Sequence, residues 1–377
     1  MVTVTWAHHA LIQGNRSGAL YGLVWTIILA VIFTACQGIE YSVSSFTISD
    51  GVFGSCFYFG TGLTEAPIEL TTIIMSSAIN CKLSPYWLTG FADAESSFVV
   101  KIGKDATRKF NLRFIPVFTI ELHERDFQLL KKIQEFFGVG ILKKRVRNGK
   151  PSVIYTVQSL KSLNEVIIPH FKEYHLLTQK QIDFYLFTKI VELINEKKHL
   201  TEDGINEIIS IRSSMNKGLS NTLKILFPNI NQVERLLIYP QVIQSPLWLI
   251  GFIDGEGCFY VKIKKGKQEG QSTLVFSVTQ HSRDLHLMNI IKDYLGCGII
   301  EKISTRPNMT VLVIYKLKDI LLKIIPFFEK YSLLGIKLLD FKDFCKIAHL
   351  MVNKEHLTEQ GMVKISIIKK GMNSKRI

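Results

Sequence analysis

The sequence contains few cysteines, and they are not clustered. Its six cysteines are scattered along 377 residues, without a CxxC pair or a dense group. We therefore expect neither a disulfide framework nor a structural zinc site, and the pattern favours a reducing compartment. The length allows two to three domains with ample core, which argues against intrinsic disorder.

Charge is nearly absent from the first 62 residues. This stretch contains one basic residue, Arg16, and two acidic residues, Glu40 and Asp50. The rest of the chain has 45 Lys and Arg residues against 30 Asp and Glu residues, a net charge of +15. The whole chain is 47% apolar, so its hydrophobic and basic characters belong to different segments. A strongly basic segment attracts polyanions such as nucleic acids.

An uncharged apolar run at residues 19–35 predicts a membrane helix. Its sequence, ALYGLVWTIILAVIFTA, approaches the roughly 20 apolar residues that span a bilayer. The run lacks the preceding basic region and the small-residue cleavage site of a secretory signal. The alternative is a buried helix of a soluble domain.

The basic part of the chain contains an internal repeat. The segment SPYWLTGFADAESSF at 84–98 matches SPLWLIGFIDGEGCF at 245–259. Further matches follow in the same order: 123–126 with 281–284 (HxRD), and 199–204 (HLTEDG) with 356–361 (HLTEQG). A collinear repeat of about 130 residues indicates duplication of a whole domain, because solenoid units have periods of roughly 20 to 50 residues. We therefore expect a pseudo-twofold molecule.

The repeat sets the expected domain boundaries. The segment 226–250 is apolar only in patches and is interrupted by Pro228, Glu234, Arg235 and Pro240, so it reads as a connection between the two halves. We expect an N-terminal segment at 1–62, a first domain at 63–217, a linker at 218–243 and a second domain at 244–377.

Each copy of the repeated motif is expected to begin with a helix. Ser84-Pro85 and Ser245-Pro246 place an N-cap hydroxyl before a proline at the first helical position. Small residues follow at a spacing of four, which puts them on one helix face, where they let two backbones approach closely. These interface residues are Gly90 and Ala94 in the first half and Gly251 and Gly255 in the second.

An acid ends each of these helices. Glu95 and Glu256 occupy the last position of the small-residue stripe, so we expect both carboxylates side by side at helix C-termini. Free carbonyls, the negative end of the helix dipole and two acids together favour a hard divalent cation, Mg²⁺. The alternative is that the acids cap exposed turns, a role for which Asp93 and Asp254 are better placed.

The two motifs, LTGFADAES and LIGFIDGEG, resemble the motif that names the LAGLIDADG homing endonucleases. The resemblance covers Ser84 to Asn373 and implies an α+β fold, with an αββαββα unit in each half. It also implies that the motif helices form the interface and that two antiparallel sheets make a saddle over DNA. It assigns metal binding to Glu95 and Glu256, with the Ala94 and Gly255 carbonyls as co-ligands.

The resemblance also implies roles for residues outside the two motifs, where the match to the family is weaker. Lys180 and Lys337 lie near the place where the family has a central basic residue that stabilises the transition state; the alternative is ordinary surface lysines. Gln280 matches a polar residue that contacts active-site water, but its counterpart in the first half is Leu122. Ser96 stands where the second motif has glycine, which puts close backbone approach in the first half in doubt.

Strand-like runs after each motif are expected to bind DNA. Apolar and basic residues alternate there, which puts Lys101 and Lys262 on a solvent face suited to a major groove. A basic loop is expected at 143–150, although charge runs are often only solubilising. The expected DNA-binding residues are Lys101, Lys143, Lys144, Arg145, Arg147, Lys262, Lys264 and Lys265.

The N-terminal segment resembles a different family. HHALIQGNRSGALYGLVWTIILA and FTACQGIEYSVSSFTISDGVFGSCFYFGTG look like an internal piece of cytochrome c oxidase subunit III, ending near Gly62. Such a piece cannot assemble an oxidase subunit, so we interpret it as a translated exon. A genuine oxidase subunit would need further hydrophobic spans, and none follow in the sequence.

These patterns together predict a monomeric, site-specific double-strand DNA endonuclease, encoded in an intron of a mitochondrial oxidase gene. The N-terminal segment would span the inner membrane until proteolysis releases the enzyme into the matrix. An alternative is an RNA-binding maturase that assists the splicing of its own intron, because a basic saddle also suits structured RNA. The retained acids favour cleavage.

Overall fold

A computed structural model describes residues 2–12, 15–43, 83–108, 110–147, 149–239, 242–263, 272–373 and 376. It divides into two compact units, Met1–Lys82 and Leu83–Ile377, which are described separately. The expected domain boundary at Leu63, and the expected DNA-binding residues Lys264 and Lys265, lie outside the described residues.

The first unit contains a helical hairpin. Helix α1 (Val2–Ile12) packs along α2 (Arg16–Val43), and Thr26 Oγ1 donates a hydrogen bond of 2.9 Å to Thr3 Oγ1. A Cβ added to Gly22 would lie only 2.9 Å from Ala7 Cβ, so the helices touch through small residues. The window Arg16–Phe33 has a mean hydropathy of 1.7 and is only 17% buried. By length and composition, α2 could cross a membrane.

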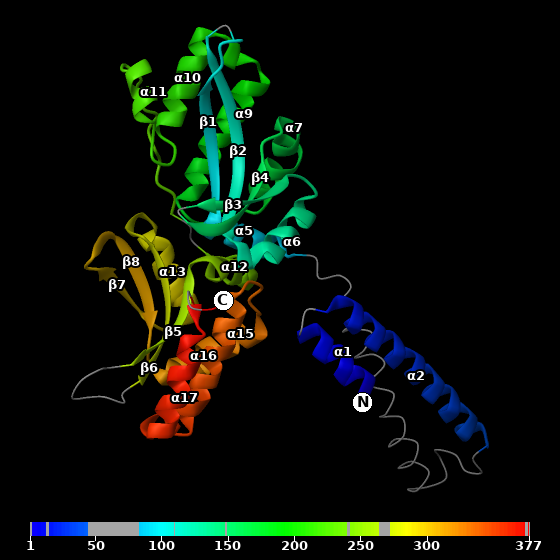
Figure 1. Ribbon diagram of the computed structural model, residues 1–377. Coiled ribbons are helices and arrows are strands. Elements are labelled where there is room, and N and C mark those ends of the chain that lie inside the picture. Colours follow the sequence, from blue (N-terminus) through cyan, green and yellow to red (C-terminus); the bar gives the residue numbers. More distant parts are fainter. Residues whose placement is uncertain are drawn as a thin grey trace. The chain divides into compact units, whose positions relative to one another are not determined.

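The second unit contains two halves with the same topology (Figure 1). In the first half, the antiparallel sheet has the order β1-β2-β4-β3, and in the second it has the order β5-β6-β8-β7. The duplicated α+β fold that the repeat predicts is confirmed. The strands are β1 (Ser96–Lys104), β2 (Leu112–His123), β3 (Ile141–Arg147), β4 (Lys150–Val157), β5 (Gly257–Ile263), β6 (Ser272–His281), β7 (Ile299–Ile303) and β8 (Arg306–Ile314).

Helices precede, interrupt and follow each sheet. The first-half helices are α5 (Pro85–Glu95), α6 (Phe127–Phe137), α7 (Leu160–Ser162), α8 (Ile168–Glu173), α9 (Lys180–Asn195) and α10 (Glu202–Ser213), followed by α11 (Asn221–Leu226) in the linker. Those of the second half are α12 (Pro246–Glu256), α13 (Leu285–Leu295), α14 (Leu317–Asp319), α15 (Ile325–Lys330), α16 (Lys337–Val352) and α17 (Glu359–Lys370).

Strand alternation gives each sheet a buried face and an open face. On β1, Phe98 and Val100 are buried and Lys101 is exposed. The Phe98 ring contacts Phe184 of α9, which lies on the helix-covered face. The prediction of a basic loop at 143–150 is wrong, because the described residues of this segment form most of β3 and the start of β4. The two strands pair in register from Ile141–Thr156 to Arg147–Lys150, so the basic side chains alternate between faces.

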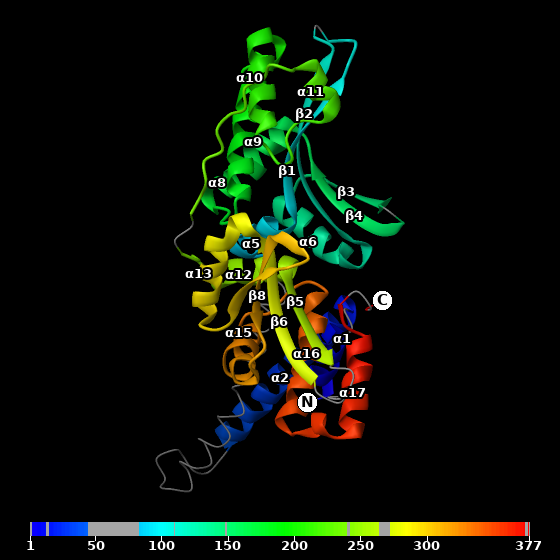
Figure 2. The ribbon, with the colours of Figure 1, turned by 90° about the vertical axis from the view of Figure 1, so that its left-hand side faces the viewer.

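Helices α5 and α12 cross where the two halves meet, and Figure 2 shows them between the two sheets. A Cβ added to Gly90 would lie 1.9 Å from the carbonyl oxygen of Trp248, and one added to Gly251 would lie 1.9 Å from that of Trp87. The contact needs glycine at both positions, since backbone atoms occupy the space of a side chain. The linker is fixed to the first half, where Arg235 forms an ion pair of 2.7 Å with Asp183.

Candidate active site

The two acidic residues of the repeated motif come together at the crossing of the motif helices. Glu95 and Glu256 are the last residues of α5 and α12, and a strand begins directly after each of them. Glu95 Oε1 lies 3.5 Å from a Cβ built on Gly255, so the carboxylate of one half faces the backbone of the other. The structure therefore places Glu95, Ala94 and Gly255 in one neighbourhood, with contributions from both halves.

Burial and neighbouring charges disturb the ionisation of both glutamates. Burial and, second to it, the negative charge of Glu95 raise the pKa of Glu256 to about 7. Burial also raises the pKa of Glu95, while the charges of Lys337 and Lys180 oppose that rise. Two adjacent, half-buried carboxylates are costly unless cations compensate them, so this part of the molecule favours positive charge.

Two lysines bind the C-terminal carbonyls of the motif helices. Lys180 Nζ donates hydrogen bonds to Ala92 O at 2.8 Å and Ala94 O at 3.4 Å. Lys337 Nζ donates to Ile253 O at 3.0 Å and Gly255 O at 2.6 Å. Burial lowers the pKa of Lys180 to about 8 and that of Lys337 in the same direction. These are not ordinary surface lysines.

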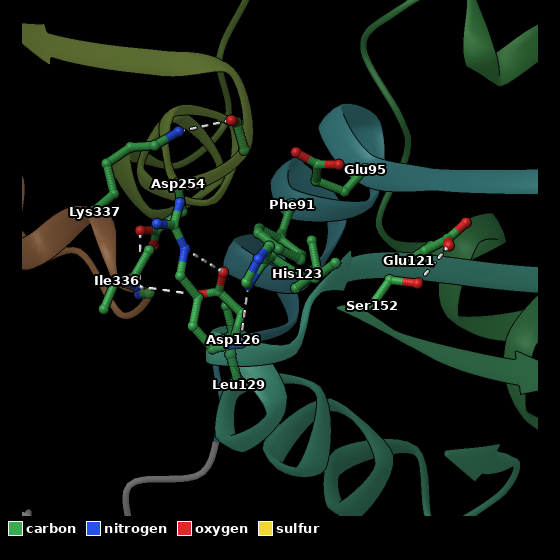
Figure 3. Close-up of a pocket in the computed structure, with 14 residues that line it drawn as sticks. Phe91, Glu95, Glu121, His123, Asp126, Leu129, Ser152, Asp254, Ile336 and Lys337 are labelled. Atoms are coloured by element: carbon green, nitrogen blue, oxygen red, sulfur yellow. Dashed lines mark hydrogen bonds and ion pairs between the residues drawn. The ribbon is translucent and has the colours of Figure 1, made fainter. Parts of the chain in front are cut away.

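A cleft beside Glu95 combines these groups. It has a volume of about 300 Å³, and Gly255 and Lys337 of the second half line it together with Asp126 of the first (Figure 3). Carboxylates of the first half and the lysine of the second half therefore line one space. Such a composite space can hold a phosphate ester between a carboxylate, which binds cations, and a lysine, which binds anions.

The motif aspartates do not cap exposed turns but hold buried loops. Asp93 is 2% exposed and accepts hydrogen bonds from the backbone N–H of Leu177 and of Thr178, just before α9. Asp254 accepts the equivalent bonds from Leu334 and Gly335, just before α16. Burial raises the pKa of each aspartate to about 6. Both aspartates thus fix the approach to the lysine-bearing helices.

The family assignment follows from this arrangement and from sequence comparison. Residues 88–191 and 249–348, which contain both motifs and both lysines, match the family model of the LAGLIDADG endonuclease. The chain belongs to the LAGLIDADG endonuclease family. The two motif-bearing halves therefore correspond to the two matched segments, and the expected resemblance is confirmed.

Individual relatives support the family assignment. The chain is 38% identical over 290 residues to "Probable intron-encoded endonuclease 3" of Neurospora crassa, a match that covers 76% of this chain and 54% of that protein. The chain thus spans about half the length of this curated relative. A structure of the LAGLIDADG homing endonuclease I-SmaMI bound to cleaved DNA is 40% identical, covers 78% of this chain and 99% of that chain, and has a TM-score of 0.75.

The N-terminal unit has a different relationship. Residues 1–93 match the family model of cytochrome c oxidase subunit III. The subunit of Emericella nidulans is 58% identical over 88 residues, which are 23% of this chain and 32% of that protein. The match extends beyond Gly62, where we expected the resemblance to end, and overlaps the first LAGLIDADG motif.

The two halves of this LAGLIDADG protein surround their acids differently. Gln280 Nε2 donates a hydrogen bond of 3.3 Å to Glu256 Oε1, whereas Leu122 offers no polar group to Glu95. Ser96 is buried and donates its hydroxyl to Ala92 O at 2.6 Å. The serine is accommodated by its own helix end, so it does not displace the neighbouring backbone.

The expected DNA-binding residues of the described chain separate into two groups. Lys101 and Arg145 lie on the open sheet face together with Glu95, where they line a second cleft of about 420 Å³. Arg145 forms a bidentate ion pair with Glu121 there. Lys144 points elsewhere, with an ion pair of 2.5 Å to Glu124. Lys143 and Lys262 are exposed on their strands, and the side chain of Arg147 lies outside the described residues.

Three acidic residues around the site were not singled out from the sequence: Glu121, Asp126 and Asp284. Glu121 lies on the open face beside Glu95, and nothing in the repeat marks it, because its counterpart in the second half is Thr279. Asp126 and Asp284 were noted only as parts of a repeated HxRD turn. Their recurrence in both halves was the signal that could have found them, since each reaches into the opposite half.

Proposed function

We propose that this chain is a site-specific endonuclease that cuts both strands of DNA and so promotes homing of its intron. The observation that carries the proposal is the pairing of Glu95 and Glu256 at the crossing of α5 and α12, each beside a half-buried lysine. The similarity to I-SmaMI, whose structure holds cleaved DNA, supports it. Two acids in two similar sites suit two cuts, one in each DNA strand.

We propose Mg²⁺ as the cofactor. The donor set fits a hard cation, because it consists of two carboxylates and of the Ala94 and Gly255 carbonyl oxygens at helix C-termini. When bound, Mg²⁺ would supply activation of a water and charge stabilisation at the leaving 3′ oxygen. The Lys180 and Lys337 ammonium groups donate to these same two carbonyls. A carbonyl oxygen has two lone pairs, so each could serve a lysine and a cation together.

The remaining residues orient the reacting groups. The lysine charges stabilise negative charge that develops on the phosphate. Gln280 orients Glu256 and a nearby water through its amide, a device that the Glu95 site lacks. Lys101 and Lys262, on the open faces of the two sheets, bind the DNA backbone, with an affinity that falls as salt rises.

We further propose a mitochondrial origin for the chain. Its N-terminal match to a mitochondrial oxidase subunit supports translation through an upstream exon into intron sequence. Helix α2 would hold the nascent protein in the inner membrane, and proteolysis after it would release a monomeric enzyme into the matrix. The cleaved target would then be the same oxidase gene without its intron.

The decisive experiment compares single acid variants on that target. The purified chain is incubated with Mg²⁺ and a duplex carrying the intronless subunit III gene, with the intron-containing gene as the non-target. Glu95→Gln and Glu256→Gln should each convert double-strand cutting into nicking while DNA binding persists. Glu207→Gln, an exposed change on α10, is the matched control and should cut both strands. Equal double-strand cutting by either acid variant would overturn the assignment, and binding of intron RNA without any DNA cleavage would favour the maturase.

A further inference from the structure

The HxRD aspartates occupy a capping position but do not cap their own helices. Asp126 and Asp284 are the N-cap residues of α6 and α13, and neither side chain makes a hydrogen bond to its own helix. Asp284 is 3% exposed. A buried carboxylate needs hydrogen-bond donors, so its partners must come from elsewhere.

Besides the preceding arginine of its own turn, at 3.9 Å from Asp126 and 3.6 Å from Asp284, each aspartate has a backbone donor from the opposite half. Asp284 Oδ1 accepts a hydrogen bond of 2.7 Å from the backbone N–H of Gln179, the residue just before Lys180. Asp126 Oδ1 accepts one of 3.3 Å from the backbone N–H of Ile336, the residue just before Lys337. Figure 3 shows Asp126 reaching Ile336 beside Lys337.

The lysine-bearing helices receive this contact at their N-terminal ends. Helix α9 also has a local side-chain cap, because Thr178 Oγ1 accepts a hydrogen bond of 3.2 Å from the backbone N–H of Lys180. Gln179 and Ile336 are the N-cap residues of α9 and α16, and neither offers a side-chain cap. The first turn of a helix leaves backbone N–H groups without partners, and a carboxylate satisfies them and favours the dipole. The HxRD acid of one half therefore helps to fix the start of the helix that presents the lysine of the other half, next to the loop that the motif aspartate of that other half holds.

The charges around each glutamate show the same exchange between halves. The charge of Lys337 lowers the pKa of Glu95 more than the charge of Lys180 does, and for Glu256 the order is reversed. The cleft beside Glu95 contains Asp126 and Lys337 together. Each site thus combines a glutamate and an HxRD aspartate from one half with a lysine-bearing helix from the other.

We propose that Asp126 and Asp284 are positioning residues that hold the opposite half's lysine in its site, so that neither half has a complete site alone. The consequence for cleavage rests on the proposed endonuclease function. Loss of Asp284 would displace Lys180 and slow the strand that is cut at Glu256, and loss of Asp126 would displace Lys337 and slow the strand that is cut at Glu95. The shorter and more buried contact of Asp284 predicts the larger effect.

The first test measures lysine access and needs no nuclease activity. The full chain in detergent is treated with formaldehyde and cyanoborohydride, and methylation of each lysine is followed by mass spectrometry. Asp284→Asn should raise the rate at Lys180 several-fold and leave Lys337 unchanged, and Asp126→Asn should do the reverse. Asp319→Asn, a partly exposed change in an ion pair with Lys323, is the matched control. Equal increases at both lysines, or none, would refute the proposal.

The second test reads the two DNA strands separately. With each strand labelled at its own end, Asp284→Asn should slow one strand about tenfold, the loss expected for one hydrogen bond to a charged group, with DNA affinity retained. Equal slowing of both strands would indicate a merely structural role and count against the proposal. Asp284→Ala is a second variant, and if it fails to fold, the nearly isosteric Asn variant decides. If the wild type cuts neither strand, the endonuclease function fails, while the methylation test still decides the positioning role.

Discussion

The indole Nε1 of Trp87 donates a hydrogen bond of 2.9 Å to Oδ2 of Asp254, which belongs to the opposite half. The symmetric bond runs from Trp248 to Asp93 at 3.0 Å. Each motif helix thus contributes a donor near its start and an acceptor near its end, and the two helices satisfy one another. The motif therefore supplies the residues of the helix–helix interface as well as the acidic residues of the site.

Replacing either tryptophan by phenylalanine should weaken the interface without changing its shape. Trp87→Phe removes one donor from the buried carboxylate of Asp254, so we expect a loss of about 1 to 3 kcal/mol in the free energy of unfolding. Urea unfolding measures it, and Trp248→Phe should behave alike. Tyr185→Phe, at a side chain that is 54% exposed, is the control. If Trp87→Phe costs no more than this control, the bond does not stabilise the interface.

The close approach of α5 and α12 makes a second prediction. An alanine Cβ at position 90 or 251 would meet backbone oxygen at 1.9 Å, and backbone cannot move aside as a flexible side chain can. Gly90→Ala and Gly251→Ala should each destabilise the protein by about 3 kcal/mol or more, the upper end of overpacking effects. Gly103→Ala, where a Cβ meets nothing within 4 Å, is the matched control in the same thermal unfolding experiment. Similar melting temperatures for all three variants would contradict the close contact.

Much of the fold could be predicted from the sequence because the same helix and strand signals occur in both halves of the repeat. Proline at the first helical position, small residues four apart and an acid before the first strand gave the bounds of α5 and α12. Such helix-start and helix-end signals depend only on residues adjacent in the sequence. Their occurrence in both halves makes the prediction of each helix stronger. The expectation of a loop at 143–150 was wrong, because the charge suggested solvent while the residues form a β-hairpin with one open face.

The contacts between halves could not be read in the same way. Nothing local distinguishes Asp126 as a cap of its own helix from a cap of α16, since only the tertiary arrangement brings Ile336 near. The lysines were equally ambiguous: Lys180 and Lys337 became distinct from surface lysines only when their Nζ atoms were placed on helix-end carbonyls. Long-range partners follow from packing, which sequence spacing does not encode.

His170 should subtract from the stability of the first half in mild acid, whereas Asp93, Asp254 and Glu256, whose pKa values burial raises, should add to stability as pH falls. His170 lies against Thr89 Oγ1 at 3.1 Å, and burial lowers the pKa of His170 to about 4 from its ordinary 6.5. The unfolded chain therefore binds the proton more readily, so this contribution to stability is present at pH 7 and falls as pH drops from 6.5 towards 4. The loss at pH 5 is about 1 to 2 kcal/mol. His170→Phe, which copies Phe327 of the second half, should remove this contribution, so its stability relative to the wild type should rise by about 1 to 2 kcal/mol between pH 7 and pH 5 in urea unfolding, and the exposed His175→Phe should show no such change.

The asymmetry around the acids should appear as unequal strand cutting. Gln280→Leu, which copies Leu122 of the first half, removes the amide donor from Glu256. We expect the strand cut at that site to slow about tenfold, because a hydrogen bond to a charged group is lost. Strand-resolved cleavage measures the effect, and the other strand is the internal control. Equal rates before and after the change would show that Gln280 does not support Glu256.

The difference between Ser96 and Gly257 is compensated one helical turn earlier. A Cβ added to Gly257 would lie 2.5 Å from Ile253 Cγ2, whereas Ser96 faces the smaller Ala92. Gly257→Ser alone should cost about 1 to 3 kcal/mol by overpacking, and Ile253→Ala alone should cost about 2 to 5 kcal/mol by leaving a cavity. The double variant recreates the first-half pair, so its cost should fall below the sum of the two by at least about 1 kcal/mol. Urea unfolding of the four proteins completes the cycle, and simple additivity would mean that the two positions do not compensate each other.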